Sequence, residues 1–478
     1  MVYIYGVPQI PLEVFLISLL PTVDNGISAK VKAELMKQKR FPRKTNASET
    51  DRNDPLTKVK AAFDAIADVA STIFDDSVRM ELVIPPCHPD EYSPHAELRE
   101  VSHISDPERP WFGRVVPWMC DSDGDNPKYN HKDLIWNCYH VLREDPRRRF
   151  TLGVTIDAEE MRLWFFSRTH NVVSEPHNFA TDPVLLIDLL CVMAFATPQQ
   201  LGYDPTMSYF VDDFKTVQFK LSLNDVVYVT KKLLSDNRTD VICGRATRVW
   251  EAYREDDPNR TSVVIKDLWT SIDVMQEGAQ LLDLHERLHA LEDPGTPRPP
   301  GDYFLSVVAH GFVQLDGVDD HTIDVMMRGH IFPGDAANHA ARKHYRIVFK
   351  EVGVAINKIQ SISDVMRALA DATRALALLH RLGLLHRDVS AGNILFVDGG
   401  GKLTDLEYLQ SFKGTAGQTP SDPDIVEHQN IPLWKWPQIA TCGWGTPCGP
   451  GVKIPVLRGP PSHSCDSTPF TISNRFSG

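Results

Sequence analysis

Three oxygen-bearing side chains between residues 384 and 407 have the types and spacing that phosphoryl transfer requires. Asn393 follows Asp388 by five residues, and Asp405 follows Asp388 by seventeen. Transfer from Mg-ATP needs one carboxylate that accepts the proton of the attacking hydroxyl, and further oxygen atoms that hold the metal ions. We therefore expect Asp388 to act as the base, and Asn393 and Asp405 to bind Mg²⁺.

The surrounding pattern places these side chains on loops at the ends of short strands. An apolar pair, Leu384-Leu385, precedes the polar loop, and the β-like run 394–397 follows it. A glycine-rich turn at 399–401 then leads to a second short strand, which ends at Asp405. The string His386-Arg-Asp388 alone could occur by chance on any solvated loop. The presence of Asn393 and Asp405 at the spacing given above makes a chance occurrence unconvincing.

A family resemblance rests on the string His386-Arg-Asp-Val-Ser-Ala-Gly-Asn393. It is similar to the catalytic loop of eukaryotic-type protein kinases, in the variant with Ser390 where most carry Lys. With Ile394-Leu395 following, this variant resembles the fungal-type protein kinase family. The resemblance implies an α+β, protein-kinase-like, two-lobed fold with an incomplete carboxy-terminal lobe, preceded by an α/β amino-terminal module.

The same resemblance implies a reaction and its participants. ATP and Mg²⁺ would be the cofactors, and the Ser/Thr hydroxyls of an unknown protein substrate would be phosphorylated. Arg387 would join Asp388 in the catalytic set, placed to form a salt bridge with an activation loop. His386 would anchor backbone rather than act as a base.

An ATP-binding lysine is expected at the end of the apolar strand 261–266. Lys266 is similar to the lysine of the Val-Ala-Ile-Lys strand, whose ammonium group bridges the α- and β-phosphates. A helix is predicted over 271–291, and its Glu277 is the preferred ion-pair partner of Lys266. Glu286 is a second candidate.

Two weaker matches complete the expected nucleotide site. The hairpin that covers the ATP phosphates usually contains three glycines, and only Gly244 is present here. Thr247 could add a hydroxyl group to the nucleotide site. The string Gly-Arg-x-Thr-x-Val-Trp at 244–250 resembles the fungal family at this place. Glu351 and Val352 occupy the hinge position, where backbone groups would bind the adenine edge.

Three departures from the kinase pattern keep other functions open. Ser390 replaces a lysine that usually contacts the γ-phosphate, and Glu407 stands where Asp-Phe-Gly has its glycine. After Phe412 there is no Ala-Pro-Glu string and no helical periodicity, so the tail 413–478 is predicted to be irregular or disordered. The alternatives are a truncated or degenerate pseudokinase that binds nucleotide or a partner, and a small-molecule kinase of the aminoglycoside or choline type.

Composition limits the other classes of function. The net charge of −13 gives no general attraction to nucleic acid or anionic membrane, and the basic string 147–149 is interpreted as a solvated loop. The eight cysteines form no Cys-x-x-Cys pair, which favours reduced thiols in an intracellular protein over a zinc site. The apolar segment 9–21 is too short to span a bilayer and is predicted to be a helix that packs on the protein.

Four regions are expected along the chain. They are an amino-terminal α/β module at 1–215, a kinase amino-terminal lobe at 216–353, a partial carboxy-terminal lobe at 354–412, and the tail. Within the module, periodicity predicts a helix over 54–74, a β-hairpin over 149–166 and a helix over 184–195. Residues 85–133 are rich in Pro, Asp, His and Gly and predict mostly irregular structure.

Overall fold

The computed structural model of this chain shows helices and strands mixed throughout, as in the expected α+β class. It describes residues 3–4, 6–21, 25–37, 55–73, 79–84, 94–100, 111–121, 127–236, 241–291, 295–322 and 341–412. The tail at 413–478, for which the sequence predicts disorder, lies outside the described residues. None of the helices in the described ranges is long and apolar enough to cross a membrane.

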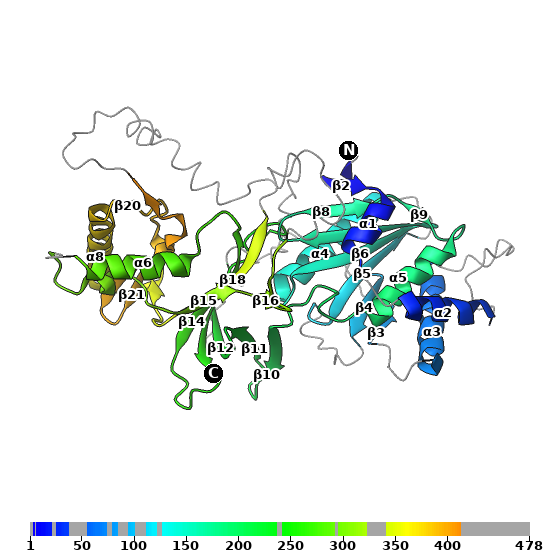
Figure 1. The fold of residues 1–478 in the computed structure, drawn as a ribbon, viewed down its shortest axis with the longest axis horizontal. Coiled ribbons are helices and arrows are strands. Elements are labelled where there is room, and N and C mark those ends of the chain that lie inside the picture. Colours follow the sequence, from blue (N-terminus) through cyan, green and yellow to red (C-terminus); the bar gives the residue numbers. More distant parts are fainter. Residues whose placement is uncertain are drawn as a thin grey trace, which may run out of the picture.

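The amino-terminal module is built on a nine-stranded mixed sheet (Figure 1). Its strand order is β1-β2-β8-β7-β6-β5-β4-β3, with β9 paired to β7. β2 runs parallel to β8 and β5 runs parallel to β6, and the other neighbours are antiparallel. The strands are β1 (Tyr3–Ile4), β2 (Val7–Ile10), β3 (Met80–Val83), β4 (Ala96–Glu100), β5 (Arg114–Asp121), β6 (Phe150–Asp157), β7 (Glu160–Ser167), β8 (Asn171–Ser174) and β9 (His177–Asn178).

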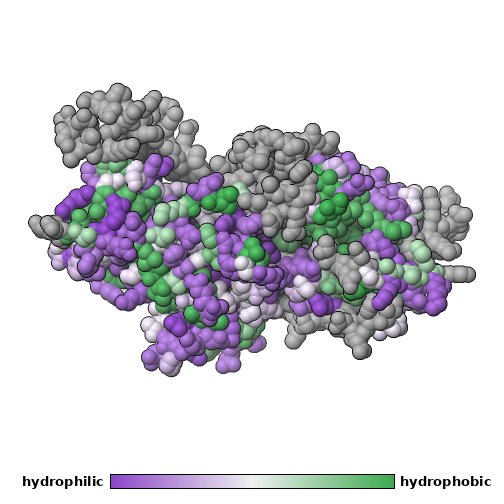
Figure 2. Space-filling view, in the orientation of Figure 1, coloured by the Kyte–Doolittle hydropathy of each residue, from purple (hydrophilic) through white to green (hydrophobic). Residues whose placement is uncertain are grey.

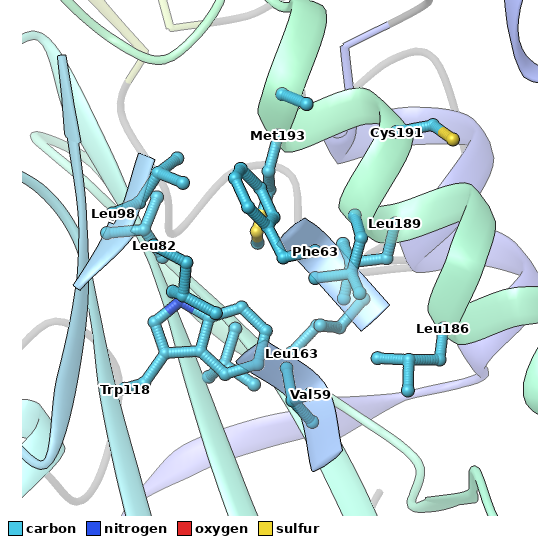
Figure 3. Close-up of a cluster of buried hydrophobic side chains, with 14 of the residues drawn as sticks. Val59, Phe63, Leu82, Leu98, Trp118, Leu163, Leu186, Leu189, Cys191 and Met193 are labelled. Atoms are coloured by element: carbon cyan, nitrogen blue, oxygen red, sulfur yellow. The ribbon is translucent and has the colours of Figure 1, made fainter. Parts of the chain in front are cut away.

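Helices cover both faces of this sheet. On one face lies a large apolar core, which Figure 3 shows between the strands and helices α3 and α5. On the other face α4, the crossover between parallel strands β5 and β6, packs in a smaller core. Successive residues of β7 alternate between the two: Leu163 and Phe165 enter the first core, while Trp164 and Phe166 enter the second. The helices are α1 (Leu12–Leu19), α2 (Asn25–Lys37), α3 (Pro55–Ile73), α4 (Pro127–Glu144) and α5 (Pro183–Phe195).

The sequence predictions for this half are confirmed where the pattern is local. The hairpin β6–β7 and helices α3 and α5 lie where periodicity places them. The prediction of mostly irregular structure at 85–133 is wrong for the described part of this range, most of which belongs to β4, β5 and the start of α4; residues 85–93, 101–110 and 122–126 lie outside the described residues. Burial in the middle of the sheet outweighs a composition that disfavours strands, and even Pro117 lies in β5 opposite Glu97.

The apolar segment 9–21 contains helix α1, as predicted, although its first two residues belong to β2. Phe15 and Leu19 are buried in the first core, and Ile17 is largely exposed. Figure 2 shows polar side chains over most of the visible face and an apolar area around α1.

A second sheet of seven antiparallel strands follows in the chain. Its order is β10-β11-β12-β13-β14-β18-β15. β10 lies in the range expected for the amino-terminal module, yet it pairs with β11, so the change from one sheet to the other precedes residue 207. The strands are β10 (Met207–Val211), β11 (Val217–Leu223), β12 (Val226–Ser235), β13 (Arg248–Arg254), β14 (Val263–Ser271), β15 (Val307–Phe312) and β18 (Arg342–Phe349).

Two helices and a β-hairpin pack beside this sheet around one further core (Figure 1). Helix α6 (Glu277–His289) begins six residues later than predicted, because β14 extends to Ser271 and a turn follows. Helix α8 (Ile362–Arg381) matches its prediction, with Ser361 as its cap. The short elements are η1 (Pro300–Tyr303), β16 (Gln314–Leu315), β17 (Val318–Asp319), β19 (Val354–Ala355), η2 (Ile356–Lys358), β20 (Leu384–Leu385), η3 (Ala391–Asn393), β21 (Ile394–Val397), β22 (Gly400–Leu403), η4 (Leu406–Tyr408) and β23 (Gln410–Ser411).

Helix α8 has two apolar faces of different kinds. Its small face, with Ala368, Ala372 and Ala375, is buried and packs on β22. The approach is so close that a Cβ at Gly401 would lie 2.5 Å from the carbonyl oxygen of Ala368. Of the larger apolar side chains, Ile362, Met366 and Leu369 are exposed.

A buried chain of alternating charges joins the two sheets. Arg149 of the module forms a bidentate ion pair with Asp320, at 2.7 and 3.0 Å. His344 lies between Asp320 (3.3 Å) and Asp267 (2.9 Å). Arg346 in turn binds Asp267 (2.7 Å) and Asp204. Because each buried charge has partners of the opposite sign, the network carries no large uncompensated charge.

The basic string at 147–149 is part of this interface, so its interpretation as a solvated loop is wrong. Arg147 pairs with Asp145 at 2.6 Å, and Arg148 is buried with hydrogen bonds to Val115 O and Thr151 Oγ1. Charge patterning alone does not distinguish a solvated arginine from one that a later segment covers.

The carboxyl end of α4 provides a second contact between the sheets. Arg248 of β13 donates to the carbonyl oxygens of Leu142 (3.3 Å) and Arg143 (2.6 Å), and Arg168 also donates to Leu142 (3.0 Å). Cations are favourable at this end of a helix, where backbone carbonyls lack partners within the helix.

Candidate active site

The hairpin β21–β22 brings two of the expected metal ligands to one end of the same element. Ile394 lies opposite Leu403 in the hairpin, so the residues just outside this pair are neighbours. The amide of Thr404 donates to the carbonyl oxygen of Asn393 at 3.0 Å. Asp405 follows immediately in a left-handed backbone conformation, with φ 64°. The sixteen residues between Asp388 and Asp405 are therefore a loop and a hairpin.

The expected base and the amide ligand are in contact. Asn393 Nδ2 donates to the carbonyl oxygen of Asp388 at 2.8 Å and to its Oδ2 at 3.2 Å. Since the nitrogen of the carboxamide faces Asp388, its oxygen is the atom that can serve a cation. Asp388 is half-buried, so a hydroxyl from solvent can reach it.

His386 holds the backbone around this loop, and Arg387 contacts a side chain farther along the chain. His386 Nδ1 accepts from the amide of Asp388 at 3.3 Å, and its Nε2 lies 3.0 Å from the carbonyl oxygen of Thr404. Burial lowers the pKa of His386, so the ring is neutral and donates from Nε2. Arg387 is exposed at φ 67° and donates to Gln410 Oε1 at 2.7 Å.

The lysine predicted to bind phosphates lies between two carboxylates. Lys266 Nζ is 2.8 Å from Glu277 Oε2 and 2.9 Å from Asp405 Oδ1, and all three side chains are buried. Burial alone would lower the pKa of Lys266, but Asp405 and Glu277 outweigh it and raise that pKa. Burial raises the pKa of Glu277. Of the two partners considered from the sequence, the structure selects Glu277, and Glu286 is exposed.

The segment expected to cover the phosphates is held elsewhere. The amide of Gly244 donates to the carbonyl oxygen of Arg168 in the amino-terminal module at 2.9 Å. That amide is therefore occupied, contrary to the role expected for it. Thr247 immediately precedes β13, in which Val249 is directly opposite Lys266. Its buried Oγ1 has no partner among the described residues.

The hinge segment connects the second sheet to the catalytic hairpin. β18 leads into 350–353, and β19 then pairs with β21. Glu351 accepts from Ser306 N (2.9 Å) and Oγ (2.8 Å) and lies 3.1 Å from Lys402 Nζ. Burial alone would raise the pKa of Glu351, but these partners lower it. Its carboxylate therefore fixes the hinge, while the neighbouring Val352 is exposed.

The site contains a charge pair that sequence reasoning did not identify. Arg245, one residue after Gly244, pairs with Glu407, the acid in the place of the usual glycine. The extra acid at 407 was visible in the sequence, but nothing local indicated a partner 162 residues earlier.

The donor set is suited to magnesium held partly by phosphate. Asn393 and Asp405 offer oxygen atoms, which Mg²⁺ prefers, and Mg²⁺ at nucleotide sites typically takes only one or two protein ligands. In the described ranges, no three or more His, Cys, Asp or Glu side chains are grouped to hold a metal ion by themselves. The residues present therefore fit a metal that arrives with nucleotide.

Comparison with known proteins identifies the family. The family model described as fungal protein kinase matches residues 98–323 and 314–422, which together span more than half of the chain. No curated protein matches this chain. A kinase-like function follows from the match, and the two matched ranges include every site residue described above. The chain is a member of the fungal protein kinase family.

Proposed function

We propose that this chain is an ATP-dependent protein kinase that transfers the γ-phosphoryl group to Ser/Thr hydroxyls of a protein inside the cell. The observation that carries the proposal is the contact of Lys266 with both Glu277 and Asp405, across 139 residues of chain. An ammonium group held between an α6 carboxylate and a metal-binding carboxylate is the arrangement that orders ATP phosphates in kinases. The second sheet with α6 would form one lobe, and α8 with the hairpin β21–β22 would form part of the other.

Each residue of the site has a role in the proposed reaction. Lys266, kept extended by Glu277, would bind phosphate oxygens. Asn393 and Asp405 would hold Mg²⁺, which supplies charge neutralisation on the phosphates when bound.

Asp388 would take the proton of the substrate hydroxyl. The hydroxyl oxygen forms its bond to the γ-phosphorus while the bond from that phosphorus to the β–γ bridging oxygen breaks, and ADP leaves. Asn393 keeps Asp388 in place through the two hydrogen bonds described above.

Binding of Mg-ATP to the full chain tests the first half of the proposal. Titration calorimetry with Mg-ATP should show binding by the natural protein and a loss of at least about tenfold in Asp405→Asn, which removes a metal-binding charge. Asp398→Asn is the matched control, because Asp398 is exposed in the β21–β22 turn. Equal binding by Asp405→Asn and the natural chain would contradict the proposed metal site.

A pseudokinase is the second candidate, and the position of Gly244 favours it. Because its amide is bonded to Arg168, Gly244 does not offer that amide to the phosphates in the described part of the chain. Transfer of labelled phosphate to a mixture of Ser- and Thr-containing peptides distinguishes the two. Asp388→Asn should abolish transfer and retain Mg-ATP binding if the chain is a kinase. Binding without transfer in the natural chain would support the pseudokinase.

A further inference from the structure

The segment 241–246 leaves the second sheet and packs on the amino-terminal module. Ile242 is buried in the core that α4 forms with Trp164 and Phe166. Cys243 Sγ lies 3.6 Å from Asn171 Oδ1, and the amide of Gly244 is bonded to the module as described above. The position of this segment is therefore set by the module.

From this anchored segment, Arg245 extends to the site. Its carbonyl oxygen accepts from the amide of Trp269 on β14 at 2.7 Å, and its side chain pairs with Glu407. Both side chains are almost fully buried, so water screens the pair little. Glu407 follows Asp405 by two residues, and Leu406 between them is fully buried in the core that includes α6.

The charges of the site show what Arg245 contributes. Lys266 contacts two buried acids, Glu277 and Asp405, and a third buried acid, Glu407, is near enough to act electrostatically on its ammonium group. Without a second cation the cluster would carry two uncompensated negative charges, and carboxylates in that state separate or take up protons. Arg245 supplies the second cation and stands closest to Glu407.

We propose that the Arg245–Glu407 pair is a positioning contact, through which the amino-terminal module holds the segment at Asp405 and thereby sets the affinity for Mg-ATP. The inference deepens the proposed function and rests on it. Both residues act through Asp405, so they are positioning residues and not catalytic ones. The module, for which the sequence offers no chemistry, then serves as a support for the metal-binding segment.

A double-mutant cycle on the full chain tests the pair. Arg245→Gln and Glu407→Gln should each weaken Mg-ATP binding about tenfold, a typical coupling between sites. The double variant should bind no more weakly than the weaker single variant, because the pair is already broken. Arg245→Lys, which keeps the charge, should retain most of the affinity.

Nucleotide without metal separates positioning from general damage. ADP in the presence of a chelator does not use Asp405, so its affinity should be the same in all variants. An equal loss for Mg-ATP and metal-free ADP would overturn the proposal, as would additive effects of the two substitutions. If the natural chain itself binds no Mg-ATP, the proposed function fails. If the natural chain and both variants bind Mg-ATP equally, only the inference fails.

A remote substitution tests the role of the module. Ile242→Ala removes packing against the module without touching the site and should also weaken Mg-ATP binding several-fold. Val241→Ala is the matched control, since Val241 is exposed beside it. If Ile242→Ala does not fold, Ile242→Val gives a smaller change in the same direction. Equal Mg-ATP affinity in the folded Ile242 variant and the Val241 control would overturn the link to the module.

Discussion

Replacement of His344 by Gln should remove a pH dependence of stability that the natural protein has. His344 is buried at the junction of the two sheets and stacks on Trp269 with ring centroids 4.7 Å apart. Burial alone would lower the pKa of its imidazole, but Asp267 and Asp320 outweigh burial and raise it to about 9. Asp204 Oδ2 lies 3.9 Å away, and Arg346 is the nearby cation that opposes protonation.

The sign and size of the effect follow from this raised pKa. The stabilisation by protonated His344 is fully present below pH 6.5, the pKa of an unperturbed imidazole, and is lost as the pH rises through about 9. At ~1.4 kcal/mol for each pKa unit, the raised pKa contributes about 3 kcal/mol to the free energy of unfolding. Burial alone would raise the pKa of Asp267, but His344 and Arg346 outweigh it and lower that pKa, so the stabilisation belongs to the His344–Asp267 pair as a unit.

Urea unfolding at several pH values measures this contribution. Between roughly pH 6 and pH 10, the free energy of unfolding should fall by about 3 kcal/mol more in the natural protein than in His344→Gln. Other groups that titrate in this range affect both proteins and cancel in the difference. His289→Gln is the control, because His289 is exposed on α6, and it should follow the natural protein. Parallel curves for the natural protein and His344→Gln would refute the reasoning.

Three further substitutions test the packing of α8 and its surroundings by urea unfolding. Gly401→Ala should cost about 1–3 kcal/mol, because the new methyl group would meet Ala368 backbone atoms at 2.5 and 2.7 Å. Gly392→Ala, whose nearest atom would lie 3.7 Å away, should cost far less, and equal losses would show that α8 and β22 are less close than described. Ser361→Ala should cost about 1 kcal/mol, since Ser361 Oγ caps the first turn of α8, whereas Ser361→Asp should retain most of that stability. Met366→Lys should change stability by less than about 0.5 kcal/mol, and a larger loss would mean that the exposed face of α8 is covered in solution.

Local patterns were sufficient to predict many of the elements that carry the site. Helix α8 has clear periodicity, the strand that contains Lys266 is a short apolar run, and motif spacing placed Asp388 and Asp405 in one catalytic region. The contact of Lys266 with Glu277 could be anticipated because β14 and α6 are consecutive in the chain. The order of motifs therefore contained most of the information about the centre of the site.

Long-range contacts account for what the sequence did not predict. β5 contains a proline and lies in a polar, Pro-rich stretch, and only its place inside the nine-stranded sheet explains it. The binding of 241–246 to the module and the pairing of Arg245 with Glu407 join residues far apart in sequence, without a periodic signal. The burial of Arg148 depends likewise on tertiary packing.

The ion pair between Arg149 and Asp320 can form only after both residues have been synthesised, and this limits when the two sheets can dock. The partners are 171 residues apart, and at synthesis rates of ~5–20 residues per second Asp320 emerges about 10–30 s after Arg149. Arg346, the second sheet's link to Asp204, emerges later still. During this interval the face of the module that meets the second sheet holds charges whose partners do not yet exist. Docking of the two sheets therefore cannot be completed before β18 has been made, and a chain released before β18 would display this charged face to solvent.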